Sequence, residues 1–164
     1  MDAYVEEALY YKSRGIKGYK AHPAGPAEFD MKVHEAVRKA VGDDFVLMTD
    51  PVGDYTLDEA IRVGRHLEKL NYLWFEEPFR DFELYKYSEL CRILDIPIAA
   101  TDTTRGCHCG VAQVIAQRAA DIVRADVSWT DRIPGTLKIG HEAAALGLPR
   151  ESPHPPTNYL AMDD

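Results

Sequence analysis

The stretch Phe45-Val46-Leu47-Met48-Thr49-Asp50 is an apolar run of strand length that ends in an acidic residue. A fully apolar run is typical of a parallel strand that is covered on both faces. The flanking segments 27–41 and 57–70 have apolar residues at helical spacing, and Thr56-Leu57-Asp58-Glu59 is a capping box that opens the second of them. This part of the chain therefore predicts a strand between two helices.

The same alternation continues outward in both directions. We predict strands at 16–21, 45–48, 72–75, 96–100, 121–123 and 148–152, and helices at 3–14, 27–41, 57–70, 82–94, 110–119 and 135–146. A repeat of roughly 25 residues with one helix between successive strands predicts right-handed βαβ units and a parallel sheet. Both an open doubly wound sheet and a (β/α)₈ barrel satisfy this pattern.

Ionisable residues stand at the carboxyl ends of the predicted strands. In chain order they are Lys20 and His22, Asp50, Glu76, Asp102, Asp126 and His154. From His22 onward the steps between them are 28, 26, 26, 24 and 28 residues. A barrel delivers such side chains to one mouth, whereas an open sheet spreads them along an edge. The regular spacing therefore favours an incomplete TIM (β/α) barrel as one domain over residues 1–164.

Asp50, Glu76 and Asp102 belong to three consecutive predicted strands. A single aspartate between a strand and a helix is more often a helix cap. Here, however, three acids occupy the same position in three successive strand–helix repeats. Three converging carboxylates raise one another's pKa unless a cation lies between them. Hard oxygen ligands in this number suit Mg²⁺, so we expect these residues to form a magnesium site.

This ordered set of motifs resembles the mandelate racemase/muconate lactonizing enzymes of the enolase superfamily, over essentially the whole chain. The matching motifs are Lys20-Ala21-His22, Met48-Thr49-Asp50, Phe75-Glu76-Glu77-Pro78, Asp95–Asp102, Asp126 and Pro153-His154. The resemblance implies that Asp50, Glu76 and Asp102 are the metal ligands. It also implies that Asp126 and His154 form an aspartate–histidine dyad.

The activity implied by the resemblance is abstraction of the proton α to a carboxylate, giving an enediolate that Mg²⁺ stabilises, with the Lys or His base known for this superfamily. Asp126 would orient His154, and His154 and His22 would remove the proton and protonate a leaving hydroxyl. Lys20 would neutralise the carboxylate or enolate oxygen of the substrate. We expect an acid sugar as the small carboxylate substrate and dehydration as the reaction, while racemisation, epimerisation or cycloisomerisation would use the same groups.

The chain departs from the family pattern in three places and in extent. His22 stands where a second lysine is common, Asp102 where glutamate is commoner, and Val52 where asparagine is frequent. The resemblance implies a piece of an enzyme of about twice this length, without the first and last barrel strands and without the capping domain. Open sheet edges in such a piece predict a homo-oligomer or association through those edges.

Composition argues against several classes of protein. The net charge of −8 without a basic stripe disfavours nucleic acid as a partner. No apolar run approaches the ~20 residues that cross a bilayer, and the N-terminus lacks the layout of a signal peptide, so we expect a cytoplasmic protein without membrane contact. Cys107-His108-Cys109 has no second ligand pair at zinc-site spacing, so the start of a helix is favoured there over a metal clip.

Two readings from other classes remain open at the level of sequence. The strand ending at Asp50 is also typical of a flavodoxin-like signalling domain with a phosphoaccepting aspartate. In that reading Arg124 is the nearest late cation to the lysine such a domain needs. The other reading is a catalytically inactive barrel fragment.

Overall fold

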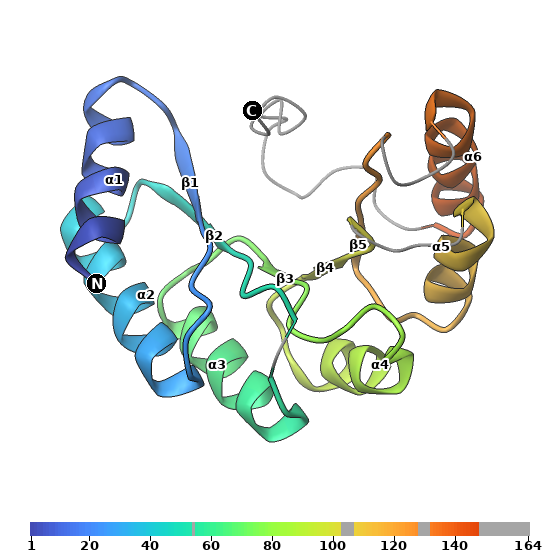
Figure 1. Ribbon diagram of the computed structural model, residues 1–164, viewed down its shortest axis with the longest axis horizontal. Helices are drawn as coiled ribbons and strands as arrows, with labels where there is room; N and C mark the ends of the chain where they lie inside the picture. The colour runs from blue at the N-terminus through green and yellow to red at the C-terminus, as the bar shows by residue number, and fades with distance from the viewer. Residues whose placement is uncertain (54, 103–106, 128–131, 148–164) are drawn as a thin grey trace.

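The computed structural model describes residues 1–53, 55–102, 107–127 and 132–147, and there helices and strands alternate (Figure 1). The helices are α1 (Asp2–Ser13), α2 (Ala27–Val41), α3 (Leu57–Lys69), α4 (Leu84–Ile93), α5 (Cys107–Ala116) and α6 (Arg132–Ala145). The strands are β1 (Gly18–Ala21), β2 (Val46–Thr49), β3 (Phe75–Glu76), β4 (Ile98–Ala100) and β5 (Ile122–Val123). Each element predicted within these residues is present with its predicted type.

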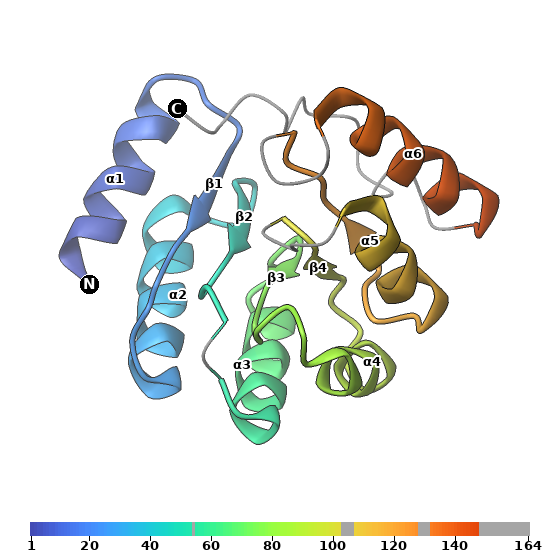
Figure 2. The ribbon, with the colours of Figure 1, turned by 45° about the vertical axis from the view of Figure 1, so that its right-hand side comes forward.

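The strands of this part of the chain form one parallel sheet in chain order, β1-β2-β3-β4-β5. Figures 1 and 2 show the helices arranged in an arc along the outer side of the curved sheet. A doubly wound sheet reverses its strand order and carries helices on both faces, so this topology rules out the flavodoxin-like alternative. The fold is an incomplete (β/α) barrel, as predicted. The predicted strand at 148–152 lies outside the described residues.

The two faces of the sheet bury different residues. Leu47, Phe75 and Ile98 belong to the main core, which lies between the strands and the helices. Met48, Trp74 and Ala99 form a separate small cluster on the inner face. Because successive side chains of a strand point to opposite faces, the residues that follow in phase with the inner cluster lie at the mouth of the barrel.

Element boundaries shifted by a few residues. The capping box of α3 is present, with the Glu59 amide donating to Thr56 Oγ1 at 3.3 Å and the Thr56 amide donating to Glu59 Oε2 at 2.9 Å. Helix α6 begins three residues earlier than predicted, because Pro134 falls in the first turn, where its missing N–H breaks no helical bond. Within the described residues, no helix is long and apolar enough to cross a membrane.

Candidate active site

Three of the predicted site residues lie side by side at the carboxyl ends of the first three strands: Lys20, Asp50 and Glu76. The register pairs Lys20 with Met48 and Thr49 with Phe75, so Asp50 and Glu76 leave adjacent strands side by side. Both carboxylates are buried: Glu76 is 0% exposed and Asp50 is 6% exposed. Two buried acids on neighbouring strands need a cation close to them.

Lys20 supplies the first of these cations. Its ammonium lies 3.5 Å from Asp50 Oδ2 and 3.3 Å from Glu76 Oε2, so both carboxylates share one nitrogen. Burial and the charge of Glu76 raise the pKa of Asp50 to about 6, against the lowering effects of Lys20 and of the Val52 amide. The raised pKa of Asp50 is therefore due first to burial and second to the charge of Glu76.

Arg124 supplies the second cation. Its guanidinium pairs with Glu76 Oε1 and lies 3.2 Å from Asp102 Oδ2. A chain of alternating charge thus runs from Asp50 through Lys20, Glu76 and Arg124 to Asp102. We call these five side chains the acid cluster. The cluster brings together all three predicted metal ligands: Asp50 directly after β2, Glu76 at the end of β3, and Asp102 in the turn after β4.

Sequence reasoning missed two members of this environment. The sequence suggests Arg124 only as the late cation of a signalling domain. Its position two residues after Ile122 of β5 is the signal that directs it to the inner face of the sheet. Trp74 donates from Nε1 to Glu76 Oε2 at 2.9 Å. Its position two residues before Glu76 on an extended segment is the signal that could have identified it.

Of the remaining predicted catalytic residues, the structure describes His22 and Asp126 but not His154. His22 Nδ1 lies 3.6 Å from Asp50 Oδ2, and its side chain is about half exposed at the mouth of the barrel. Asp126 follows β5 and is partly buried. His154 lies outside the described residues, so the Asp126–His154 dyad stays a prediction.

The acid cluster does not have the geometry of a preformed metal site. Among the described residues, no group of three or more His, Cys, Asp or Glu side chains is arranged to hold an ion. Lys20 and Arg124 lie between the carboxylates instead. Helix α5 begins at Cys107, so the stretch Cys107-His108-Cys109 is the start of a helix, as expected. The chemistry of the donor set, three adjacent carboxylates, still matches the preference of Mg²⁺ for oxygen.

Known proteins resemble this chain over most of its length. An arabinonate dehydratase of Saccharolobus solfataricus is 37% identical over 88% of the chain and 39% of its own length. A D-galactarolactone cycloisomerase of Agrobacterium fabrum is 32% identical over 92% of the chain and 39% of its own length. The structure of a D-glucarate dehydratase from Agrobacterium tumefaciens, complexed with magnesium, superimposes with a TM-score of 0.84 at 37% identity and covers 88% of this chain and 40% of that one.

The chain spans about two fifths of the length of the relatives it matches. The model of the family described as "Enolase C-terminal domain-like" matches residues 3–161, which is almost the whole chain. The consecutive parallel strands, the acid cluster at their carboxyl ends and this match agree with one another. The chain belongs to the enolase C-terminal domain-like family, as the sequence motifs indicated.

Proposed function

We propose that this chain carries the metal-binding and proton-transfer residues of a Mg²⁺-dependent acid-sugar dehydratase, a lyase that removes the proton α to a carboxylate. The observation that carries the proposal is the acid cluster, in which acids from three consecutive strands are linked through Lys20 and Arg124. Similarity to dehydratases of arabinonate and D-glucarate supports the reaction and the substrate class.

The donor chemistry of the residues present suits a magnesium ion, although Lys20 and Arg124 lie between the carboxylates in this structure. Glu76 is fully buried and accepts from two cationic side chains, which indicates that positive charge is required at this point. Asp50, Glu76 and Asp102 would hold the ion, taking over contacts now made by Lys20 and Arg124. When bound, Mg²⁺ supplies positive charge to an oxygen of the substrate carboxylate and thereby lowers the cost of forming the enediolate.

The other residues divide the proton chemistry. Lys20, near the carboxyl end of β1, neutralises the carboxylate or enolate oxygen of the substrate. His22 lies at the mouth beside Asp50 and can give a proton to a leaving hydroxyl. Asp126 orients His154, which removes the α-proton. Dehydration follows when the hydroxyl next to the enediolate leaves.

Cycloisomerisation is the second candidate, because a D-galactarolactone cycloisomerase is among the relatives. Both reactions can begin with transfer of the same proton, so the same residues serve either. They differ in product: a dehydratase releases water and yields a keto acid, whereas a cycloisomerase conserves the composition of its substrate. Mass spectrometry of products from a set of acid sugars and their lactones separates the two.

The metal site is tested by thermal unfolding with and without magnesium. Mg²⁺ at millimolar concentration should raise the Tm, because a ligand that binds only the native state stabilises it. Glu76→Gln should abolish the rise, while Glu89→Gln, at a partly buried residue of α4 outside the acid cluster, should keep it. An unchanged Tm of the unmodified chain in Mg²⁺ would contradict the metal site.

The base is tested by isotope exchange. In D₂O the enzyme should exchange the α-hydrogen of an acid-sugar substrate, and His154→Asn should stop the exchange. His141→Asn, on the exposed surface of α6, is the matched control and should exchange normally. Full exchange in His154→Asn would assign the base to another residue.

We also propose a cytoplasmic location and self-association through open sheet edges. In the described part of the chain, β1 and β5 are the outermost strands, and each pairs on one side only. An unpaired edge offers free N–H and C=O groups to another strand. Size-exclusion chromatography with light scattering should find an oligomer, and a stable monomer would contradict this part of the proposal.

A further inference from the structure

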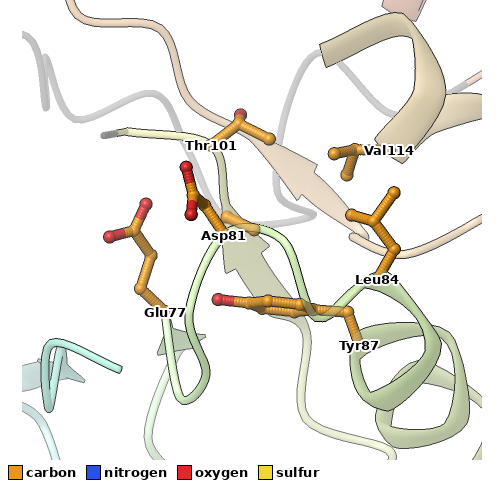
Figure 3. A pocket seen from close by; sticks show the side chains of 7 residues that line it. Glu77, Asp81, Leu84, Tyr87, Thr101 and Val114 are labelled. Atoms are coloured by element: carbon orange, nitrogen blue, oxygen red, sulfur yellow. The ribbon is translucent and has the colours of Figure 1, made fainter. Parts of the chain in front are cut away.

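Glu77, the residue after the proposed ligand Glu76, lies on the opposite side of its strand end. Its side chain is buried, and it lines a small pocket between the strand turns and helices α4 and α5 (Figure 3). Figure 3 shows Glu77, Asp81 and Thr101 on the side of the turns, with Leu84 and Val114 toward the helices. The Glu77 carboxylate therefore lies on the side of the strand ends that faces α4 and α5, and it is not one of the five side chains of the acid cluster.

The Glu77 carboxylate makes a specific contact with the next strand end. Its Oε1 accepts the backbone N–H of Asp102 at 2.8 Å. The backbone N–H of Glu77 itself donates to the Ala99 carbonyl at 2.9 Å, so the turn after β3 is joined both to β4 and to the turn that follows β4. Of these two bonds, the one made by the side chain reaches the residue that carries the third proposed metal ligand.

Backbone conformation shows that this arrangement is held against local strain. Glu77 has φ 39° and Thr101 has φ 82°, both in the left-handed region that side chains disfavour. Thr101 is anchored on its other side by a bond from its Oγ1 to the Arg124 carbonyl at 2.6 Å. Strained residues persist only where their surroundings over-determine them, and such sites are commonly functional.

We propose that Glu77 is a positioning residue, whose buried carboxylate holds the backbone of Asp102 so that the Asp102 side chain is presented to the metal. This inference rests on the proposed magnesium site. A charged acceptor forms a stronger bond to a backbone amide than a neutral one does. Partners that orient metal ligands in this way typically contribute 10- to 100-fold, roughly, to metal affinity.

The test compares Mg²⁺ affinity in three variants of the full chain by titration calorimetry with the metal alone. Glu77→Met removes the acceptor and should raise the Kd about 10- to 100-fold. Glu77→Gln keeps an acceptor oxygen at the same reach without the charge, so it should raise the Kd less than Glu77→Met does. Asp81→Asn removes a charge from the same pocket without touching Asp102 and should leave the Kd unchanged.

The outcomes separate this inference from the function on which it rests. If the unmodified chain does not bind Mg²⁺, the metal site itself fails. If it binds and Glu77→Met binds equally well, only the positioning role is overturned. Equal weakening by Glu77→Gln and Asp81→Asn would assign the effect to charge and would also overturn the role.

A direct measurement guards against a variant that does not fold. The Asp102 amide should exchange slowly with solvent in the unmodified, metal-free chain, because its hydrogen is held by Glu77. Exchange of this amide as fast as that of an open peptide would overturn the proposal without any substitution.

Discussion

Polar side chains are part of the packed core on the helix-covered face of the sheet, whereas on the inner face they form the charged acid cluster. On the covered face, Thr49 Oγ1 lies 2.8 Å from Nε2 of His34, and both residues are 0% exposed. On the inner face the very next residue, Asp50, contacts Lys20 and the half-exposed His22. One step along β2 therefore separates a polar group used for packing from one available for chemistry.

The ring of His34 is enclosed on both sides. Nε2 lies 2.8 Å from Thr49 Oγ1, and the buried Nδ1 has no hydrogen-bond partner among the described residues. Burial, with a smaller contribution from His66, lowers the pKa of His34 to about 3. His34 is thus a neutral core residue. A histidine on the helix-covered face packs in the core, whereas His22 on the inner face lies half exposed beside Asp50.

Substitutions at the neighbouring positions 75 and 76 should show the largest difference between the two faces, one affecting stability and the other the response to Mg²⁺. Phe75 is fully buried among the helices, so Phe75→Ala should lower the free energy of unfolding by about 3–5 kcal/mol. The variant should nevertheless keep its stabilisation by Mg²⁺, which Glu76→Gln should lose. Urea unfolding with and without the ion measures both effects. Loss of the Mg²⁺ response in a folded Phe75→Ala protein would show that the two faces are not separable.

Arg124 should give two effects of opposite sign. Arg124→Gln removes the partner of Glu76 and Asp102, so the free energy of unfolding without metal should fall by roughly 1.5–3 kcal/mol. Mg²⁺ should then bind more tightly, because no guanidinium competes for the same oxygens.

Arg92→Gln is the matched control for this substitution. Arg92 is exposed and pairs with Glu89 on α4, so its loss should cost about 0–1 kcal/mol and leave Mg²⁺ affinity unchanged. Chemical unfolding and calorimetry on both variants give the two numbers. Weaker Mg²⁺ binding in Arg124→Gln would contradict the view that Arg124 and the metal exchange places.

The sequence was sufficient for the fold and for most of the acid cluster, because both depend on periodicity. Strand ends recur at a nearly constant spacing, so Asp50, Glu76 and Asp102 could be placed at one mouth without coordinates. Arg124 and Glu77 could not be assigned their contacts. Those contacts depend on how far a long side chain reaches across to the next strand, and no spacing along one chain encodes that distance.

Strand limits were also poorly predicted, for a related reason. The strand expected at 72–75 is assigned only to Phe75–Glu76, although the Leu73 amide still donates to the Leu47 carbonyl at 2.7 Å. Apolar character extends beyond the residues that form regular ladder bonds, because residues before a strand also pack into the core.

The pH dependence of stability should contain two opposing contributions, one from each face. His34 has a lowered pKa, so the unfolded chain binds a proton near pH 6.5 that the folded chain refuses until about pH 3. Stability from this group is present above pH 6.5 and is lost as the pH falls through this window, by up to about 1.4 kcal/mol per pH unit. Asp50 has a raised pKa, so its contribution is present below about pH 4 and is lost as the pH rises to about 6.

Single variants should expose each contribution in metal-free buffer. Between pH 4 and 6 the two slopes oppose each other in the unmodified chain. His34→Gln should remove the loss of stability toward acid, and Asp50→Asn should make that loss steeper. Urea unfolding across this range measures the slopes, and His141→Gln on the exposed surface of α6 serves as the control. Identical slopes in all the variants would mean that neither face holds its group in the stated protonation state.

The smallest effect is expected at the cap of α3, which begins shortly after the turn that carries Asp50. Thr56→Ala removes the acceptor for the Glu59 amide and should lower the free energy of unfolding by about 1 kcal/mol. Thr56→Ser keeps the hydroxyl and should restore most of it. Because the cap is exposed and makes no contact with the acid cluster, Mg²⁺ affinity should stay the same in both variants. A weaker affinity in Thr56→Ala, restored in Thr56→Ser, would show that the helix layer sets the position of Asp50 through this turn.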